Sequence, residues 1–349
     1  LPEGEEADGE LIDPQQAAVI IMSHLDRLCR SHLPSKMWTS RIQNYRNQQI
    51  ISLGYNGLSP EFNVFSSEAE DKWMYDYTRN SNYSAPTIDF GANINVDQIA
   101  CAENVIYLLS MTGEVYEVKL QSDQMKALKL EGFDAVVTRI YGNCEGRHYI
   151  AITVNQEVYA WGIGDNGRLG LGEDCTTMTK PTKIISLNEK QVIGASCGTT
   201  YSAVYTATGE LYTFGQGLFG KLGHGNSDDK FVPTLVNALK SHKIVDVACG
   251  DTHTLCVNDQ GKVFAFGDSD FGKLGVGLTN GSQVPILVDT SSNIKNVYAG
   301  SHFSMAMSND GISLYSFGKG GRLGHENVLE DLYIPKKIEG LNGKKINKV

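Results

Sequence analysis

The feature that most constrains the fold of this chain is a five-residue phrase that recurs four times after residue 157. Each copy alternates apolar or aromatic residues with a small residue and ends in an aromatic residue followed by glycine. The copies are Val158–Gly162, Leu211–Gly215, Val263–Gly267 and Leu314–Gly318, and their closing glycines are 53, 52 and 51 residues apart. A repeat of this length predicts similar units that stack, because one unit cannot bury its apolar faces alone.

A second phrase, Gly-Arg/Lys-Leu-Gly, follows each aromatic phrase at a nearly fixed distance. Its copies begin at Gly167, Gly220, Gly272 and Gly321. Upstream of each aromatic phrase, β-rich runs are separated by turn residues such as Thr208-Gly209-Glu210, a pattern typical of hairpins. Many short strands with periodic glycines and aromatic residues favour a radial β repeat.

These phrases closely resemble the repeats of the regulator-of-chromosome-condensation family. The resemblance implies an all-β fold, a seven-bladed β-propeller. Kelch repeats have a comparable period, but no double-glycine strand end followed by their Tyr and Trp spacing is present here. WD-type repeats are shorter and carry Trp-Asp, which this sequence never contains.

The sequence predicts three regions. Residues 1–37 form an acidic leader with an amphipathic helix from Asp13 to about His32, because Asp and Pro open an apolar stripe at helical spacing. Residues 38–95 are irregular, with a possible degenerate blade. Residues 96–349 form the propeller repeats with a truncated last blade, and the short helical extension precedes them.

The first blade of the propeller region is predicted to be degenerate. Gln98–Ala102 and Thr112–Tyr116 match phrases of the regular repeats, but the aromatic-glycine pair and the long loop are missing. The final residues, Gly343–Val349, match the start of an inner strand. We count five recognisable blades or parts of blades, so seven would need irregular N-terminal blades or a longer chain.

Composition argues against several classes of partner. The formal net charge is −10, and phosphate binding depends on Lys and Arg, so we expect no direct nucleic-acid binding. Seven cysteines without a C-x-x-C pair predict reduced thiols in a cytoplasmic or nuclear protein and no metal site. The longest apolar runs are too short for a membrane span. No cofactor is expected.

No convincing catalytic set is present. The G-x-G-x-x-G pattern of Gly162–Gly167 would need a strand and a helix around it to bind a nucleotide, and it lies in a strand-rich repeat, so a structural turn is favoured. His253 and His302 are interpreted as one repeat position, which holds Tyr201 in another copy. Because tyrosine replaces histidine there, hydrogen bonding within a blade is favoured over catalysis.

The candidate site is a partner-binding surface on the loops. Arg168, Lys221, Lys273 and Arg322 share one repeat position, where contact with acidic partners is one interpretation and an internal ion pair or stem packing is the favoured one. Loop aromatic residues are better anchors. The predicted partner-binding residues are Phe219, Phe271, Asp165, Lys221, Lys273 and Arg322.

The order of blades suggests a function. A degenerate blade, the strand His148–Ala151 and then four regular blades are similar to the first propeller of the large HERC ubiquitin ligases. That resemblance implies a parent protein that transfers ubiquitin through a HECT domain outside this chain. The chain itself is then no enzyme and recruits or positions substrates or regulators.

Two alternatives stay open. The founding member of the family exchanges guanine nucleotide on a small nuclear GTPase, which would need a hairpin inserted in one blade and a basic surface. The spacing of the regular repeats hardly changes and the chain is acidic. A structural scaffold for neighbouring domains is the third class, and an apolar patch away from the loops would favour it.

Overall fold

The computed structural model describes residues 37–45, 48–56, 87–89, 94–102, 105–119, 124–143, 145–277, 280–325, 330–341 and 345–346. Within these residues the regular elements are β-strands and short 3-10 helices, as the all-β prediction required. The helix predicted between Asp13 and His32 lies outside the described residues.

Among the first strands, β3 pairs with β2 in the antiparallel and with β7 in the parallel orientation. Strands β1 and β2 form an antiparallel hairpin in which Ile42 pairs with Ile51, within the segment predicted to be irregular. Strands β4 to β7 follow one another in chain order, where the degenerate blade was predicted. The strands are β1 (Met37–Tyr45), β2 (Gln48–Asn56), β3 (Thr87–Asp89), β4 (Val96–Ala102), β5 (Val105–Ser110), β6 (Val115–Lys119) and β7 (Gln124–Lys129).

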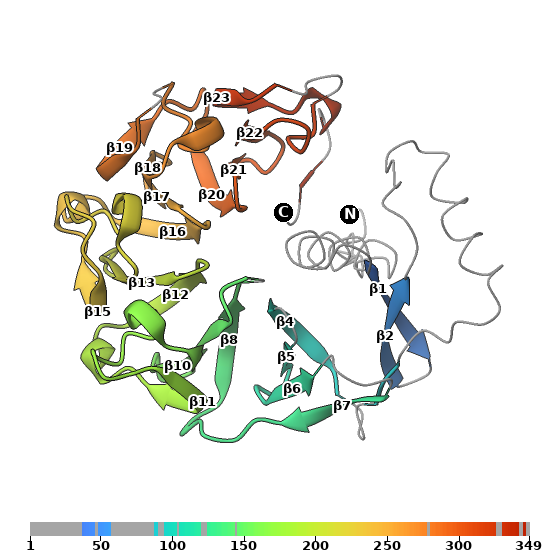
Figure 1. Ribbon diagram of the computed structural model, residues 1–349. Coiled ribbons are helices and arrows are strands. Elements are labelled where there is room, and N and C mark those ends of the chain that lie inside the picture. Colours follow the sequence, from blue (N-terminus) through green and yellow to red (C-terminus); the bar gives the residue numbers. More distant parts are fainter. Residues whose placement is uncertain are drawn as a thin grey trace, which may run out of the picture. The chain divides into compact units, whose positions relative to one another are not determined.

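The chain divides into two compact units, and the larger one contains residues 96–103, 107–116 and 129–349. Four four-stranded antiparallel sheets follow one another in it (Figure 1). Sheet 1 has β8 (Val137–Gly142), β9 (His148–Thr153), β10 (Val158–Ile163) and β11 (Thr177–Lys183). Sheet 2 has β12 (Val192–Cys197), β13 (Tyr201–Thr206), β14 (Leu211–Gly215) and β15 (Lys230–Leu235).

The other two sheets repeat this order. Sheet 3 has β16 (Ile244–Cys249), β17 (His253–Asn258), β18 (Val263–Gly267) and β19 (Ser282–Val288). Sheet 4 has β20 (Ile294–Ala299), β21 (Phe303–Ser308), β22 (Leu314–Gly318) and β23 (Leu332–Lys337). The 3-10 helices are η1 (Asp165–Gly167), η2 (Ile185–Leu187), η3 (Leu218–Gly220), η4 (Asn237–Leu239), η5 (Asp270–Gly272) and η6 (Glu339–Leu341). Each predicted aromatic phrase is the third strand of a sheet.

The core of the larger unit lies between consecutive sheets. The first strands contact one another in sequence, β8 with β12, β12 with β16 and β16 with β20. Every residue of β9, β13 and β17 is buried, because these strands are covered on both faces. Leu169, Leu222 and Leu274 each add a fully buried side chain from the loop of one sheet to the cluster shared with the next. Burial on both faces explains why these strands do not alternate apolar and polar residues.

The fourth strand of each sheet is its outer edge. Each of these strands carries a proline, which donates no hydrogen bond and is tolerated on an edge. The prolines are Pro181, Pro233, Pro285 and Pro335. They protect the exposed edges against pairing with other chains.

The closing glycines direct the loops toward the neighbouring sheet. Gly215 has a φ of 112°, and a Cβ there would lie 2.5 Å from the Cα of Tyr201. The loop that follows such a glycine carries η1, η3 or η5, and each of these helices packs on the third and fourth strands of the next sheet. The repeated loops therefore gather at one end of the sheets, at the junctions between them.

Candidate functional site, a loop surface for protein binding

We define the loop end as residues 164–176, 216–229 and 268–277, which join the third and fourth strands of sheets 1 to 3. These loops contain the 3-10 helices η1, η3 and η5. The central residue of each of these three helices has a left-handed backbone, with φ of 59° at Asn166, 65° at Phe219 and 63° at Phe271. This conformation is uncommon for bulky residues and costs energy that glycine avoids. Two phenylalanines are therefore held at strained positions of an exposed turn.

Phe219 is the open anchor of this surface. Its side chain is 47% exposed, as is that of Leu218 beside it at 48%. The helix η3 packs on β19, whose Val284 is 46% exposed and lies close to the same loop. Phe219 and Leu218 of the loop and Val284 of β19 are thus exposed apolar residues at the junction of sheets 2 and 3.

Phe271 occupies the equivalent position at the junction of sheets 3 and 4, and its ring is partly covered. The Lys319 ammonium lies 4.7 Å from the ring centroid, and the His302 ring lies 5.3 Å away. Tyr333 and Ile334 of β23, against which η5 packs, remain 43% and 63% exposed. At this junction Tyr333 and Ile334 are therefore more accessible to a partner than Phe271 is.

Two predicted partner-binding residues lie inside the molecule. The side chains of Lys221 and Lys273 are each 1% exposed, so the prediction that they contact a partner is wrong. The Lys221 ammonium donates to the Thr200 hydroxyl at 2.7 Å and to the Gln216 amide oxygen at 3.0 Å. Burial lowers its pKa to about 8. The alternative interpretation, internal packing, describes both residues.

The neighbouring lysine has a charged partner. Lys273 forms an ion pair with Asp268, which occupies the position of Gln216 in the next loop. Burial alone would raise the pKa of this carboxyl, but the hydrogen bond and charge of Lys273 hold it below its ordinary value. The third buried cation, Arg168, donates from Nη1 to the carbonyl oxygens of Gly146 and Thr199.

The remaining predicted residues lie at the surface. Asp165 opens η1 with an exposed side chain, and Arg322 is exposed in the fourth loop, beyond the loop end as defined. The structure therefore brings Phe219, Phe271 and Asp165 to one end and leaves their role as partner contacts a prediction. Sequence reasoning missed Val284 and Ile334. Their position directly before a proline of the outer strand was the available signal.

The histidine position predicted from the repeats needs a correction. The residue that pairs with each closing glycine is His148, Tyr201, His253 or Phe303, so His302 precedes the position instead of occupying it. The His148 ring bonds the Ser202 hydroxyl at 2.8 Å, and Ser202 donates to the Arg168 carbonyl. Burial lowers the pKa of His148 to about 4.

The same relay recurs in the next sheets. His253 bonds the Ser304 hydroxyl at 2.9 Å, and Ser304 donates to the carbonyl of Lys273. The Tyr201 hydroxyl receives a hydrogen bond from Thr254, which lies 2.7 Å from the carbonyl of Lys221. Each hydroxyl thus fastens the loop of one sheet to the second strand of the next, a structural role.

The surface charge of the loop end is negative. Its basic side chains, Arg168, Lys221 and Lys273, are buried beneath the surface. Its exposed charged side chains are Asp165, Glu173, Asp174, Asp228 and Asp270. The loop end therefore combines apolar anchors with carboxylates.

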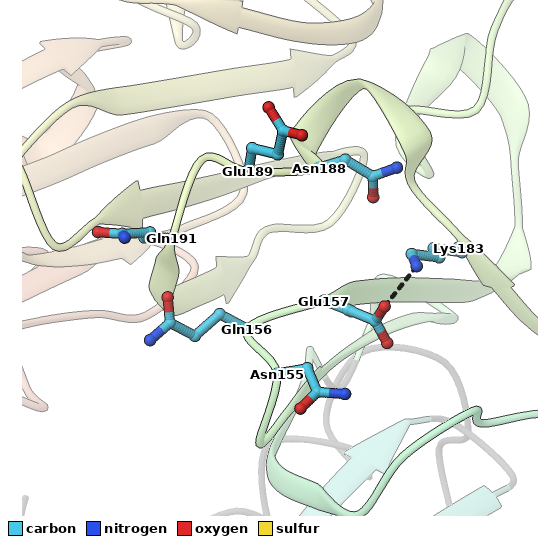
Figure 2. Close-up of a pocket in the computed structure, with 7 residues that line it drawn as sticks. All are labelled: Asn155, Gln156, Glu157, Lys183, Asn188, Glu189 and Gln191. Carbon is cyan, nitrogen blue, oxygen red and sulfur yellow. Dashed lines mark hydrogen bonds and ion pairs between the residues drawn. The ribbon is translucent and has the colours of Figure 1, made fainter.

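A polar pocket opens at the opposite end of the sheets (Figure 2). It lies between the β9–β10 turn and the linker before β12, and the Lys183–Glu157 ion pair, 2.5 Å long, crosses one side. Its lining residues are Asn155, Gln156, Glu157, Lys183, Asn188, Glu189 and Gln191. The pocket offers hydrogen bonds and charge but no apolar anchor.

The described residues contain no group of three or more His, Cys, Asp or Glu side chains placed to hold a metal ion. No helix among them has the length and apolar character to cross a membrane.

Three segments match the model of the regulator of chromosome condensation (RCC1) repeat, residues 155–205, 208–257 and 260–307. A second model of the same repeat matches residues 244–273. Each match starts before the third strand of one sheet and ends in the second strand of the next. The sequence repeat is therefore shared between two sheets.

The chain is similar in sequence to curated proteins of known name. It is 40% identical to the human E3 ubiquitin-protein ligase HERC2 over 97% of the chain, which spans 7% of the length of that ligase. It is 36% identical to the ultraviolet-B receptor UVR8 of Arabidopsis thaliana, over 58% of the chain and 46% of the receptor.

Two solved structures share the fold. Human WBSCR16 gives a TM-score of 0.63 at 19% identity, covering 74% of this chain and 71% of the other. Prp20p of Saccharomyces cerevisiae gives 0.60 at 20% identity, covering 70% and 63%. The fold of the larger unit is a β-propeller of this type, while the number of seven blades stays a prediction. The repeat matches and the sheets agree, so residues 155–307 of this chain are RCC1 repeats.

Proposed function

We propose that this chain is a protein-binding propeller of a longer ubiquitin ligase, and that it recruits or positions substrates or regulators through its loop end. The observation that carries the proposal is Phe219, an aromatic residue held at φ 65° with 47% of its side chain exposed. A strained, exposed aromatic residue has a cost in stability and no packing benefit, which favours a role in binding.

Similarity to HERC2 along 97% of the chain supports the connection with ubiquitin transfer. The structure of Prp20p is described together with its binding to Gsp1p and histones, which supports proteins as the class of partner. Ubiquitin transfer itself would belong to another part of the parent protein, so this chain would act without catalysis of its own.

The proposal is tested by affinity capture with the full chain as bait, beside Phe219→Ala and Ile185→Ser. Ile185 is an exposed apolar residue in the linker between sheets 1 and 2, at the opposite end. Proteins lost only from the Phe219 variant are then measured for ubiquitin conjugation with and without the parent ligase. We expect conjugation to change for at least one of them.

Two outcomes contradict the proposal. If captured proteins are retained equally by the Phe219 variant and the wild-type chain, the loop end does not recruit them. If the Phe219-dependent protein is a small GTPase held in its nucleotide-free form, nucleotide exchange replaces recruitment as the function.

A further inference from the structure

From the loop end we infer the chemistry of the partner, and this inference rests on the proposed function. We propose that the loop end binds an extended, basic segment of a partner protein whose bulky apolar side chains occupy successive sheet junctions. The inference combines the repetition of the apolar areas with the charges around them.

The apolar areas repeat from junction to junction. At each one, the loop of a sheet packs on the outer strand of the next sheet, where the residue before the proline is exposed. These residues are Val232 at 47%, Val284 at 46% and Ile334 at 63%. Their loops are fixed to the strands by the backbone bonds from Gly172 to Phe231, Gly225 to Gln283 and Gly277 to Tyr333. The areas are therefore fixed on the fold and recur at the three junctions between sheets 1 and 4.

Such spacing suits an extended chain. Packed sheets lie about 10 Å apart, and an extended chain rises about 3.3 Å per residue. Side chains on one face of an extended chain recur every second residue, so anchors four residues apart, about 13 Å, are the shortest repeat on one face that exceeds this sheet spacing. The predicted segment has bulky residues at every fourth position.

The charges select a basic partner. The exposed carboxylates of the loop end, such as Asp165, Asp228 and Asp270, lie on the same three loops as the apolar areas. The cations of these loops are buried and engaged by carbonyl, hydroxyl, amide or carboxylate oxygens, as for Lys221 and Arg168. A partner therefore meets carboxylates on these three loops, which attract Lys and Arg and repel Asp and Glu. Lys319, over the Phe271 ring, and Arg322 add positive charge only from the fourth loop.

The test is fluorescence anisotropy of the full chain with three labelled peptides. The first has Phe at every fourth position and Lys with Ser between, the second replaces Lys by Glu, and the third replaces Phe by Ser. We expect the first peptide to bind at least tenfold more tightly than either of the others. Its affinity should fall as salt rises, because screening weakens exposed charge pairs.

Variants locate the binding. Phe219→Ser should weaken the first peptide at least fivefold, and the triple variant Asp165→Asn/Asp228→Asn/Asp270→Asn should remove most of the salt dependence. Ile185→Ser, at the opposite end, should leave affinity unchanged. Thermal unfolding of each variant checks that the fold is retained, and the changed side chains are exposed or partly exposed, so it should be.

Each contrary outcome has a defined meaning. If the Glu peptide binds as tightly as the Lys peptide, or the Lys peptide does not bind, the basic chemistry is wrong, while Phe219-dependent capture of a protein still supports recruitment. If Ile185→Ser weakens the peptide as much as Phe219→Ser does, the loop end is the wrong surface.

Discussion

Lys221 and Lys273 occupy equivalent positions in consecutive loops but have different partners. Lys273 has the carboxylate of Asp268, whereas Lys221 has the neutral amide of Gln216 and a pKa lowered to about 8 by burial. The change Gln216→Asp should reproduce the next loop. We expect it to stabilise the fold at pH 7 by about 1 kcal/mol, measured by urea unfolding.

The lowered pKa of Lys221 also predicts how the stability of the fold depends on pH. Lys221 has a pKa of about 8 in the folded chain against an ordinary value of 10.5, so between these values the unfolded chain holds one more proton. Stability contributed by this residue therefore rises with pH from 8 to 10.5. Gln216→Asp should remove that rise. An unchanged pH profile in this variant would contradict the assignment.

The buried histidines predict how the stability of the fold depends on acidic pH. Burial lowers the pKa of His148 to about 4 and that of His253 to about 3, from an ordinary value of 6.5. Below pH 6.5 the unfolded chain therefore binds protons that the folded chain excludes, and stability falls as pH falls toward 4. Over that interval each histidine accounts for on the order of 3 kcal/mol.

The repeat itself supplies the replacement for this test. At the equivalent position of sheet 2 the chain has Tyr201, whose hydroxyl accepts a hydrogen bond from Thr254 in the next sheet. The double variant His148→Tyr/His253→Tyr should unfold at a lower pH than the wild-type chain, followed by circular dichroism during acid titration. An identical acid midpoint would show that other groups govern acid unfolding.

Each sheet junction depends on the glycine that closes the third strand. Gly215 and Gly172 have nearly the same φ, 112° and 111°, but only at Gly215 would a Cβ collide with the neighbouring strand. Gly172→Ala should therefore cost about 1 kcal/mol of conformational energy, and Gly215→Ala several kcal/mol. Urea unfolding of both variants measures the difference, which is the contribution of the close approach. Equal costs would contradict it.

Elements whose requirements are local could be predicted from the sequence. The strands β10, β14, β18 and β22 and their closing glycines followed from one phrase, because a left-handed turn after a strand selects glycine. The position of Phe303 was also available, since Gly198, Gly250 and Gly300 each precede the residue that pairs with the closing glycine by three. The prediction placed His302 at that position because it is a histidine, although the glycine spacing indicated Phe303.

The features that the sequence did not predict depend on distant partners. Lys221 is buried because Thr200 and the Asp251 carbonyl come from the sheets on either side of its loop, 21 and 30 residues away. Nothing in the Gly-Lys-Leu-Gly phrase distinguishes that side chain from an exposed one. The hairpin of β1 and β2 lies where no period was visible, so only pairing between its strands defines it.

For the whole larger unit, the repeat boundaries predict how a local defect spreads. Each matched repeat ends in the second strand of the following sheet, and the buried leucine of its loop packs into the cluster shared by both. Stability should therefore be coupled mainly between neighbouring sheets, as in other repeat proteins. Leu222→Ala, at a side chain 1% exposed, should cost about 3 kcal/mol through the cavity that it leaves.

Hydrogen exchange followed by mass spectrometry can map this coupling. Leu222→Ala should reduce protection most in sheets 2 and 3, and Leu169→Ala should move the same pattern by one junction, to sheets 1 and 2. Both leucines are fully buried members of equivalent clusters, so the two variants control for each other. Equal loss of protection in all four sheets for both variants would show that the propeller opens as one unit, and that its loops fasten the sheets without dividing them into separately stable neighbours.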